Sequence, residues 1–224
     1  MFYQLKGKLI VIEGTDGSGK ATQTELIADA LRLAGLTVNR LSFPDYDSDS
    51  SALIKMYLRG EFGTRPDDVN AYAASSFYAV DRYASFRKWS EKYEKGEIFI
   101  ADRYTQSNAI YQCSKLPREK WDEFLQWLWE YEFDLLGIPR PDMTIYLSVP
   151  VEVSQKLMTA RYEGDEKKKD IHEADVEFQR RCREAAEYCA EKYGWKVIEC
   201  SKDREMLQKE IIRDKILEVI GKIF

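Results

Sequence analysis

A glycine-rich loop near the start of the chain is its strongest chemical signal. Residues 14–20 read GTDGSGK, between the apolar run 9–12 and a helical pattern over 21–33. Glycines let successive backbone N–H groups face one anion, a helix N-terminus adds partial positive charge, and Lys20 adds a full one. The order strand, loop, helix therefore predicts a site for the phosphates of a nucleoside triphosphate rather than a plain turn.

Two further stretches combine polar and aromatic side chains at helical spacing. Tyr104, Asn108 and Tyr111 would share one helix face if Tyr104 begins a helix, and Arg103 precedes them. This face could bind a nucleoside, or it could be a helix start with partly exposed tyrosines. Tyr78 and Arg82 are also four residues apart; they could stack on a base and bond its carbonyl, or pack among the many aromatic residues of that helix.

A third feature is the charged segment 161–170, which begins at Arg161 and carries Lys167, Lys168 and Lys169. Such a segment between two helices is usually a solvated loop. In a chain with a phosphate-binding loop, it could instead be a lid whose cations close over the phosphates and exclude water. The residues alone leave both interpretations open.

The secondary structure that positions these side chains can be predicted from the chain, because apolar runs alternate with helical patterns along it. We expect strands at about 9–12, 37–43, 97–101, 143–149 and 195–200. We expect helices at about 21–33, up to 58, 66–95, 105–113, 118–131, 151–160, 173–193 and 203–220. This alternation predicts an α/β fold with a parallel sheet covered on both faces. The glycine loop, Phe43 and Asp102 follow strands and should meet at one edge.

Composition narrows the class of protein. The 224 residues suit one domain or at most two, and the net charge of −5 disfavours a nucleic-acid partner. The four cysteines form no CxxC pair and the chain has one histidine, which disfavours zinc and suits a reducing cytosol. No signal-peptide pattern or apolar run of membrane length is present, so we expect no membrane association.

The features together resemble thymidylate kinase, in order and over nearly the whole chain. The resemblance rests on IEGTDGSGKATQ (12–23), Phe43-Pro44, YAVDR (78–82), DRYTQSNAIYQ (102–112) and the charged segment that leads to DIHE (170–173). It implies a P-loop NTPase fold, with a five-stranded parallel sheet, helices on both faces and a lid at about 161–172 of a single domain, 1–224. It also implies phosphoryl transfer from ATP to dTMP with Mg²⁺, in a cytoplasmic homodimer.

The resemblance also assigns roles to residues. The ATP phosphates would be held by Gly14, Thr15, Asp16, Gly17, Ser18, Gly19, Lys20, Ala21 and Thr22. The acceptor nucleotide would be held by Asp16, Phe43, Tyr78, Arg82, Arg103, Tyr104, Asn108 and Tyr111. Asp16 would meet the sugar 3′-hydroxyl, although an Asp-Gly turn is the simpler alternative. Tyr78 would stack on thymine, Arg82 would bond its carbonyl and Asn108 would read its edge. Tyr104 and Tyr111 would crowd out a 2′-hydroxyl.

The catalytic assignments are Lys20, Asp102, Arg103 and Arg161, and three departures bear on them. Ala21 replaces the usual hydroxyl ligand of magnesium, so we expect Asp102, water and ATP oxygens to hold the metal. Gly17 stands where some members carry an arginine, which leaves the lid to supply cations. The loop after Phe43-Pro44 lacks an arginine for the acceptor phosphate. The alternatives are a kinase for another nucleotide or deoxynucleoside, or a catalytically silent nucleotide-binding protein.

Overall fold

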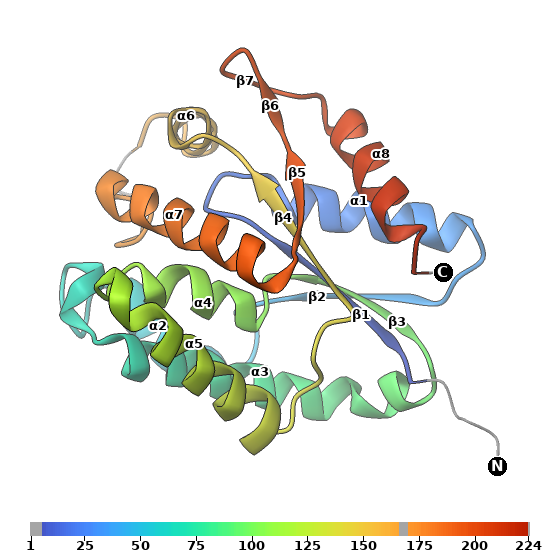
Figure 1. Ribbon diagram of the computed structural model, residues 1–224, viewed down its shortest axis with the longest axis horizontal. Coiled ribbons are helices and arrows are strands. Elements are labelled where there is room, and N and C mark those ends of the chain that lie inside the picture. Colours follow the sequence, from blue (N-terminus) through green and yellow to red (C-terminus); the bar gives the residue numbers. More distant parts are fainter. Residues whose placement is uncertain (1–5, 166–169, 224) are drawn as a thin grey trace.

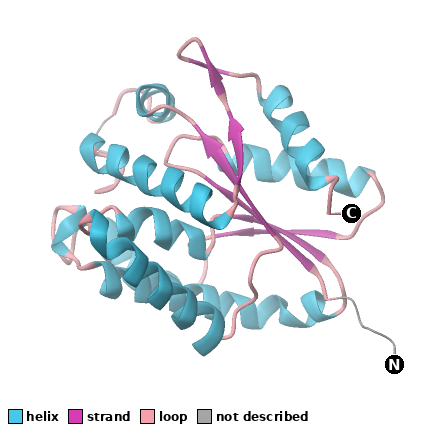
Figure 2. Cartoon of the chain, in the orientation of Figure 1, coloured by secondary structure: helices cyan, strands magenta, loops and turns pink. Residues whose placement is uncertain are grey.

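One five-stranded sheet forms the centre of the computed structural model, which describes residues 6–165 and 170–223. Its strands are β1 (Lys8–Glu13), β2 (Val38–Ser42), β3 (Ile98–Asp102), β4 (Met143–Ser148) and β5 (Lys196–Glu199). The order is β2-β3-β1-β4-β5, and every neighbouring pair is parallel. The predicted parallel sheet is confirmed, and Figure 2 shows it as a twisted layer between helices.

The pattern of apolar residues explains which strands are central. Leu9, Ile10, Val11 and Ile12 are completely buried, because β1 has a neighbour on each side and helices over each face. In each of the edge strands β2 and β5 only one residue is buried, and the others are partly or largely exposed. Strand β1, whose apolar run 9–12 is buried throughout, lies in the middle of the sheet and leads directly into the glycine loop.

Helices cover both faces of the sheet (Figure 1). The bounds are α1 (Lys20–Leu33), α2 (Ala52–Leu58), α3 (Ala71–Glu94), α4 (Thr105–Cys113), α5 (Trp121–Trp129), α6 (Val151–Arg161), α7 (Val176–Tyr193) and α8 (Lys209–Ile220). Helices α1 and α8 pack on one face, and α3, α4, α5 and α7 lie on the other. A π-helical segment, Glu130–Leu135, continues α5. Within the described residues, no helix combines the length and apolar character that crossing a bilayer requires.

The last predicted helix, 203–220, begins later than expected. Residues 201–206 instead form a small hairpin of β6 (Ser201–Lys202) and β7 (Glu205–Met206). Asp203 and Arg204 have φ angles of 52° and 63°, the left-handed conformation that two-residue hairpin turns require. Helix α8 starts only after this turn, at Lys209. The sequence did not reveal the hairpin because its turn contains no glycine.

Candidate functional site

A cleft of about 930 Å³ opens at the carboxyl ends of the strands, as the sheet topology predicts. Its size is typical of sites for small molecules. It is lined by the glycine loop, the Phe43-Pro44 turn, the end of β3 and both ends of the charged segment. The structure therefore brings together Lys20, Asp102, Arg103 and Arg161, which are far apart in the sequence.

The glycine loop is shaped for phosphate. Gly17 and Gly19 line the cleft and have φ angles of 76° and 85°, which glycine adopts without side-chain strain. Lys20 Nζ donates a hydrogen bond to the Thr15 carbonyl oxygen at 2.8 Å. The hydroxyls of Thr15 and Ser18 are buried and have no hydrogen-bond partner among the described residues. Such groups suit a ligand rich in oxygen.

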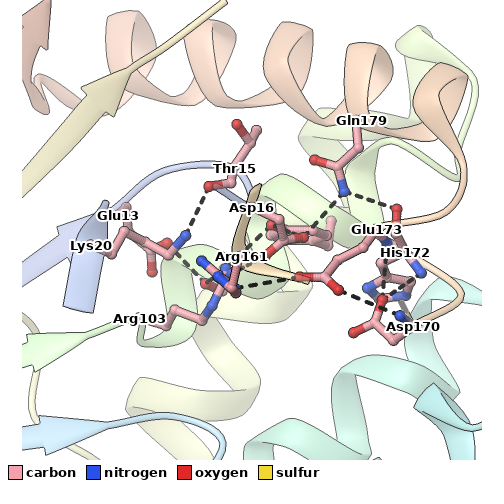
Figure 3. Close-up of polar contacts among 12 residues, drawn as sticks. Glu13, Thr15, Asp16, Lys20, Arg103, Arg161, Asp170, His172, Glu173 and Gln179 are labelled. Atoms are coloured by element: carbon pink, nitrogen blue, oxygen red, sulfur yellow. Dashed lines mark hydrogen bonds and ion pairs between the residues drawn. The ribbon is translucent and has the colours of Figure 1, made fainter. Parts of the chain in front are cut away.

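Arg103, directly after β3, contacts Asp16 of the glycine loop in the lining of the cleft (Figure 3). The Arg103 guanidinium forms an ion pair with Asp16 Oδ1. Tyr111 Oη donates to Asp16 Oδ2 at 2.8 Å, and Gln179 Nε2 donates to the same oxygen at 3.1 Å. Burial by itself raises the pKa of Asp16, but Arg103 and Lys20 outweigh burial and hold this pKa well below its usual value. Asp16 is therefore a charged acceptor.

The backbone of Arg103 is held in an unusual conformation. Its φ angle is 67°, and its N–H donates to the Ile12 carbonyl oxygen at 3.1 Å. The buried Glu13 carboxylate accepts hydrogen bonds from Tyr104 N–H at 2.9 Å and from Ser107 Oγ at 2.8 Å. The end of β1 thus fixes the turn between β3 and α4 and points Arg103 into the cleft. Sequence reasoning assigned Glu13 no role, although a carboxylate ending a buried strand was a signal.

A pocket of about 80 Å³ lies next to the cleft and shares with it Asp16, Phe43 and Arg103. Its other walls include the predicted residues Tyr78, Arg82, Asn108 and Tyr111. It also includes His172, which stacks on Tyr111 with ring centroids 5.5 Å apart. The structure therefore places a polar, aromatic pocket beside the candidate phosphate site.

The structure does not bring Tyr104 to either cavity. The shared face was conditional on Tyr104 beginning the helix. Helix α4 instead starts at Thr105, at the expected bounds 105–113, and Tyr104 is extended, with φ −159° and ψ −149°. The spacing rule therefore applies to Asn108 and Tyr111 and not to Tyr104. Its ring is fully buried beside Phe43, and its hydroxyl donates to the Pro139 carbonyl oxygen at 3.2 Å. The Tyr104 ring therefore packs against Phe43, which lines both the cleft and the smaller pocket.

Buried polar residues missed by sequence reasoning surround the predicted ones. Glu132, from the π-helical segment, accepts two hydrogen bonds of 2.6 Å from Arg82. His172 accepts from or donates to Tyr57 Oη at 2.8 Å, and Gln179 holds both Asp16 and the His172 carbonyl. Each contact joins elements that are far apart in the sequence, so no local sequence motif predicts it.

The charged segment is described at its two ends. Arg161 ends α6 with its side chain 57% exposed, and its Nη1 lies 3.7 Å from Glu173. Asp170 accepts backbone N–H groups of His172 and Glu173 at 2.8 and 2.9 Å. Burial, together with the charge of Asp16, raises the pKa of Asp170 to about 7. The predicted lid lysines, Lys167, Lys168 and Lys169, lie outside the described residues.

Gly17 provides a test of how the loop and α6 fit together. A Cβ at Gly17 would lie 2.6 Å from the carbonyl oxygen of Ser154 in α6, and the φ angle of 76° disfavours any other residue. We expect Gly17→Arg to lower turnover about tenfold or more instead of supplying a helpful cation, because α6 must shift. Steady-state kinetics and thermal unfolding check this, with Leu33→Arg as a control at the exposed end of α1, outside the cleft. Wild-type turnover and unfolding temperature in Gly17→Arg would contradict the expectation.

The comparisons with known proteins agree with the geometry of the cleft. A family profile described as Thymidylate kinase matches residues 12–211. The chain belongs to the thymidylate kinase family. Thymidylate kinase of Mycobacterium tuberculosis is 34% identical over 195 residues, which cover 85% of this chain and 90% of that protein. The human thymidylate kinase is 25% identical over 207 residues, covering 92% and 88%.

A solved structure of thymidylate kinase from Candida albicans has the same fold. Its TM-score is 0.69, over 97% of this chain and 92% of that chain, at 21% sequence identity. At this identity the likeness concerns the fold alone: a P-loop NTPase sheet surrounded by helices. The fold expected from the sequence is thereby confirmed.

Proposed function

We propose that this member of the thymidylate kinase family transfers the γ-phosphoryl group of ATP to dTMP and forms ADP and dTDP. One observation carries the proposal: the glycine loop with Lys20 and the nucleoside pocket with Asn108 open into one cleft, with Arg103 between them. Arg103 is close enough to Lys20 to contribute to lowering the pKa of that lysine. Two anionic nucleotides can thus meet end to end.

The reaction needs positioning and charge neutralisation more than a general base. A phosphate monoester has a second pKa of about 6, so the acceptor oxygen of dTMP is largely deprotonated at neutral pH. Lys20 and the loop N–H groups would hold the ATP phosphates, and Arg103 would hold the dTMP phosphate. Repulsion between the two is the main obstacle, and Arg161 at the edge of the cleft is placed to reduce it.

The nucleoside would lie in the smaller pocket. Asp16 is a charged acceptor and suits the 3′-hydroxyl of the sugar, while Tyr111 and His172 form a wall beside it. Tyr78 and Phe43 supply aromatic surface for the base. Arg82 and Asn108 lie where they can reach the polar edge of thymine.

We propose that magnesium is held by ATP oxygens, water and Asp102. Asp102 lines the cleft, and its Oδ1 is buried with no hydrogen-bond partner among the described residues, which fits a water-coordinated cation. No cluster of three His, Cys, Asp or Glu residues suited to a metal occurs in the described parts of the chain. Ala21 offers no hydroxyl, so the nucleotide must provide most ligands. Bound magnesium would draw charge away from the ATP phosphates.

Asp102→Asn tests this metal assignment. We expect the magnesium concentration for half-maximal rate to rise about tenfold, because the neutral amide attracts the cation and its water ligands less. A magnesium titration at saturating ATP and dTMP measures it. Asp142→Asn is the matched control, since Asp142 bonds Lys8 and Leu9 N–H outside the cleft. An unchanged magnesium dependence in Asp102→Asn would remove Asp102 from the metal site.

We also propose that residues 1–224 form one domain whose segment at about 161–172 acts as a lid, and that two copies form a cytoplasmic homodimer. Tyr72, Val80 and Tyr83 of α3 are each about two-fifths exposed and fall on one side of that helix, which supports a partner there. Sedimentation equilibrium tests the dimer; a monomer at micromolar concentration would argue against it.

The decisive experiment measures ADP formation from ATP and magnesium with dTMP, dUMP, dCMP, UMP, dGMP and AMP in parallel. A clear preference for dTMP is the expected result. Preference for another monophosphate would keep the P-loop chemistry and overturn the base assignments. ATP binding without turnover of any acceptor would favour the silent nucleotide-binding protein, with Ala21 as the residue to replace by serine.

A further inference from the structure

Glu132 is the centre of a fully buried polar cluster behind the nucleoside pocket. Its side chain is 0% exposed and that of Arg82 is 2% exposed. Its Oε1 accepts from Arg82 Nη2 at 2.6 Å and from Asn108 Nδ2 at 2.9 Å. Its Oε2 accepts from Arg82 Nε at 2.6 Å and from Thr105 Oγ1 at 2.9 Å. One carboxylate thus holds the two residues assigned to the base edge.

These contacts decide which way the Asn108 amide faces. Asn108 Nδ2 donates to Glu132 Oε1 at 2.9 Å and to the Ser75 carbonyl oxygen at 3.1 Å. A carboxylate and a backbone carbonyl can only accept, so the nitrogen must face them and the amide cannot be turned over. Asn108 lines the pocket, and its Oδ1 is left to accept from a ligand.

The same carboxylate orients Arg82. Nε and Nη2 are both used by Glu132, in the two-pronged geometry that fixes a guanidinium plane. The bonds of Arg82 to Glu132 leave Nη1 as the remaining terminal nitrogen, and Arg82 lines the pocket. The pocket therefore presents a fixed donor from Arg82 and a fixed acceptor from Asn108.

We propose that Glu132 is a positioning residue that sets the base specificity of the enzyme, by holding Arg82 as a donor and Asn108 as an acceptor. Thymine and uracil present the complementary pair, a C4 carbonyl beside an N3–H. Cytosine presents the reverse pair, an amino group at C4 and an unprotonated N3. Cytosine would therefore meet donor against donor and acceptor against acceptor. The inference rests on the proposed function and names a residue that touches no substrate.

Glu132→Gln tests the proposal because it replaces an acceptor-only group with an amide that has one acceptor and one donor. Wherever its NH₂ group points, it opposes a donor of Arg82. Where it also faces Asn108 Nδ2, that amide keeps only the Ser75 carbonyl oxygen as an acceptor and is held less firmly. We expect the ratio of kcat/KM for dTMP to that for dCMP to fall about 10- to 100-fold from wild type. The ratio of dTMP to dUMP should not change, because their edges are identical.

Two variants separate positioning from packing. Glu132→Asp keeps an acceptor-only carboxylate, so it should retain much of the preference for dTMP over dCMP even with a higher KM. Asp81→Asn alters a different buried carboxylate, in α3, which accepts from Asp45 N–H at 2.9 Å outside the base edge; this variant should leave the ratio at its wild-type value. A wild-type dTMP to dCMP ratio in folded Glu132→Gln, or its loss in Asp81→Asn, would overturn the proposal.

Glu132→Gln leaves Arg82 as a buried charge without its partner, so it can fail to fold. In that case Arg82→Met/Glu132→Gln is compared with Arg82→Met/Glu132→Met, since neither leaves an unpaired buried charge. The variant with glutamine should show the stronger preference for dTMP, because only its side chain can still accept from Asn108 Nδ2; equal preferences would overturn the proposal. Calorimetric binding of dTMP and dCMP runs alongside turnover. Binding that follows these ratios without turnover would contradict the proposed reaction and leave the role of Glu132 supported.

Discussion

Replacing Arg103 with methionine is expected to lower kcat/KM for dTMP by about 10³-fold, while ATP still binds. Arg103 is the cation between the nucleoside pocket and the glycine loop, and its guanidinium can bind two phosphate oxygens at once. Without it, the dianionic acceptor would approach ATP with its charge unbalanced. Steady-state kinetics with dTMP varied, together with calorimetric ATP binding, measures both parts of the expectation.

Arg103→Lys is the matched control for this experiment. Lysine keeps the charge and has the same difficulty with the φ angle of 67°, but it lacks the planar fork. We expect a loss between those of the wild type and Arg103→Met. Tyr111 and Gln179 still bond Asp16 in both variants, so the loop keeps two of its supports. Equal activity of wild type and Arg103→Met would remove Arg103 from the reaction.

Lys20→Met is expected to reduce kcat by about 10²- to 10³-fold, the usual result of deleting a charge that stabilises a developing anion. Lys20 is 6% exposed and lies at the base of the glycine loop, where little water can replace it. Burial and the charge of Arg103 lower the pKa of Lys20 to about 8. Single-turnover measurements at saturating ATP separate this effect on transfer from any loss of ATP binding.

The same lysine should give the enzyme an alkaline limit. As the pH rises through about 8, Lys20 loses its proton and its charge, so kcat/KM for ATP, which reports the free enzyme, should fall above pH 8. Lys20→Arg should abolish this decline, because arginine does not titrate there. Lys115 also has a pKa of about 8 but lies outside the cleft, so Lys115→Arg should keep the decline. Its disappearance in Lys115→Arg would assign the titration elsewhere.

The sheet and most helices were predictable because their signals are local. Apolar runs such as 9–12 mark strands that are buried on both faces, and the rule for strand ends then placed Lys20, Asp102 and Arg103 at one edge. The hairpin before α8 was missed because Asp203 and Arg204 adopt left-handed conformations that their residue types do not predict. Local patterns predict elements well and fail where an ordinary residue takes a special φ angle.

The site was predictable only in its local parts. Helical spacing put Asn108 and Tyr111 on one face of α4, and both line the smaller pocket, whereas Tyr104 precedes α4 and falls outside that spacing. The role of Glu132 was invisible, since 50 residues separate it from Arg82 and a buried glutamate resembles any other in a sequence. Side chains that touch a ligand can follow motifs, whereas those that hold them depend on tertiary contacts.

The position of β1 in the middle of the sheet also has a consequence during protein synthesis. Glu13 at its end is bonded to Tyr104, 91 residues later, and Leu9 at its start to Asp142, 133 residues later. At the usual ribosomal rate, the strand waits roughly 7–27 s before its second neighbour has been made. For that interval the apolar run 9–12 lacks at least one of its two neighbouring strands. The nascent chain is therefore a natural client for chaperones, and slow refolding with aggregation at high concentration is expected in vitro.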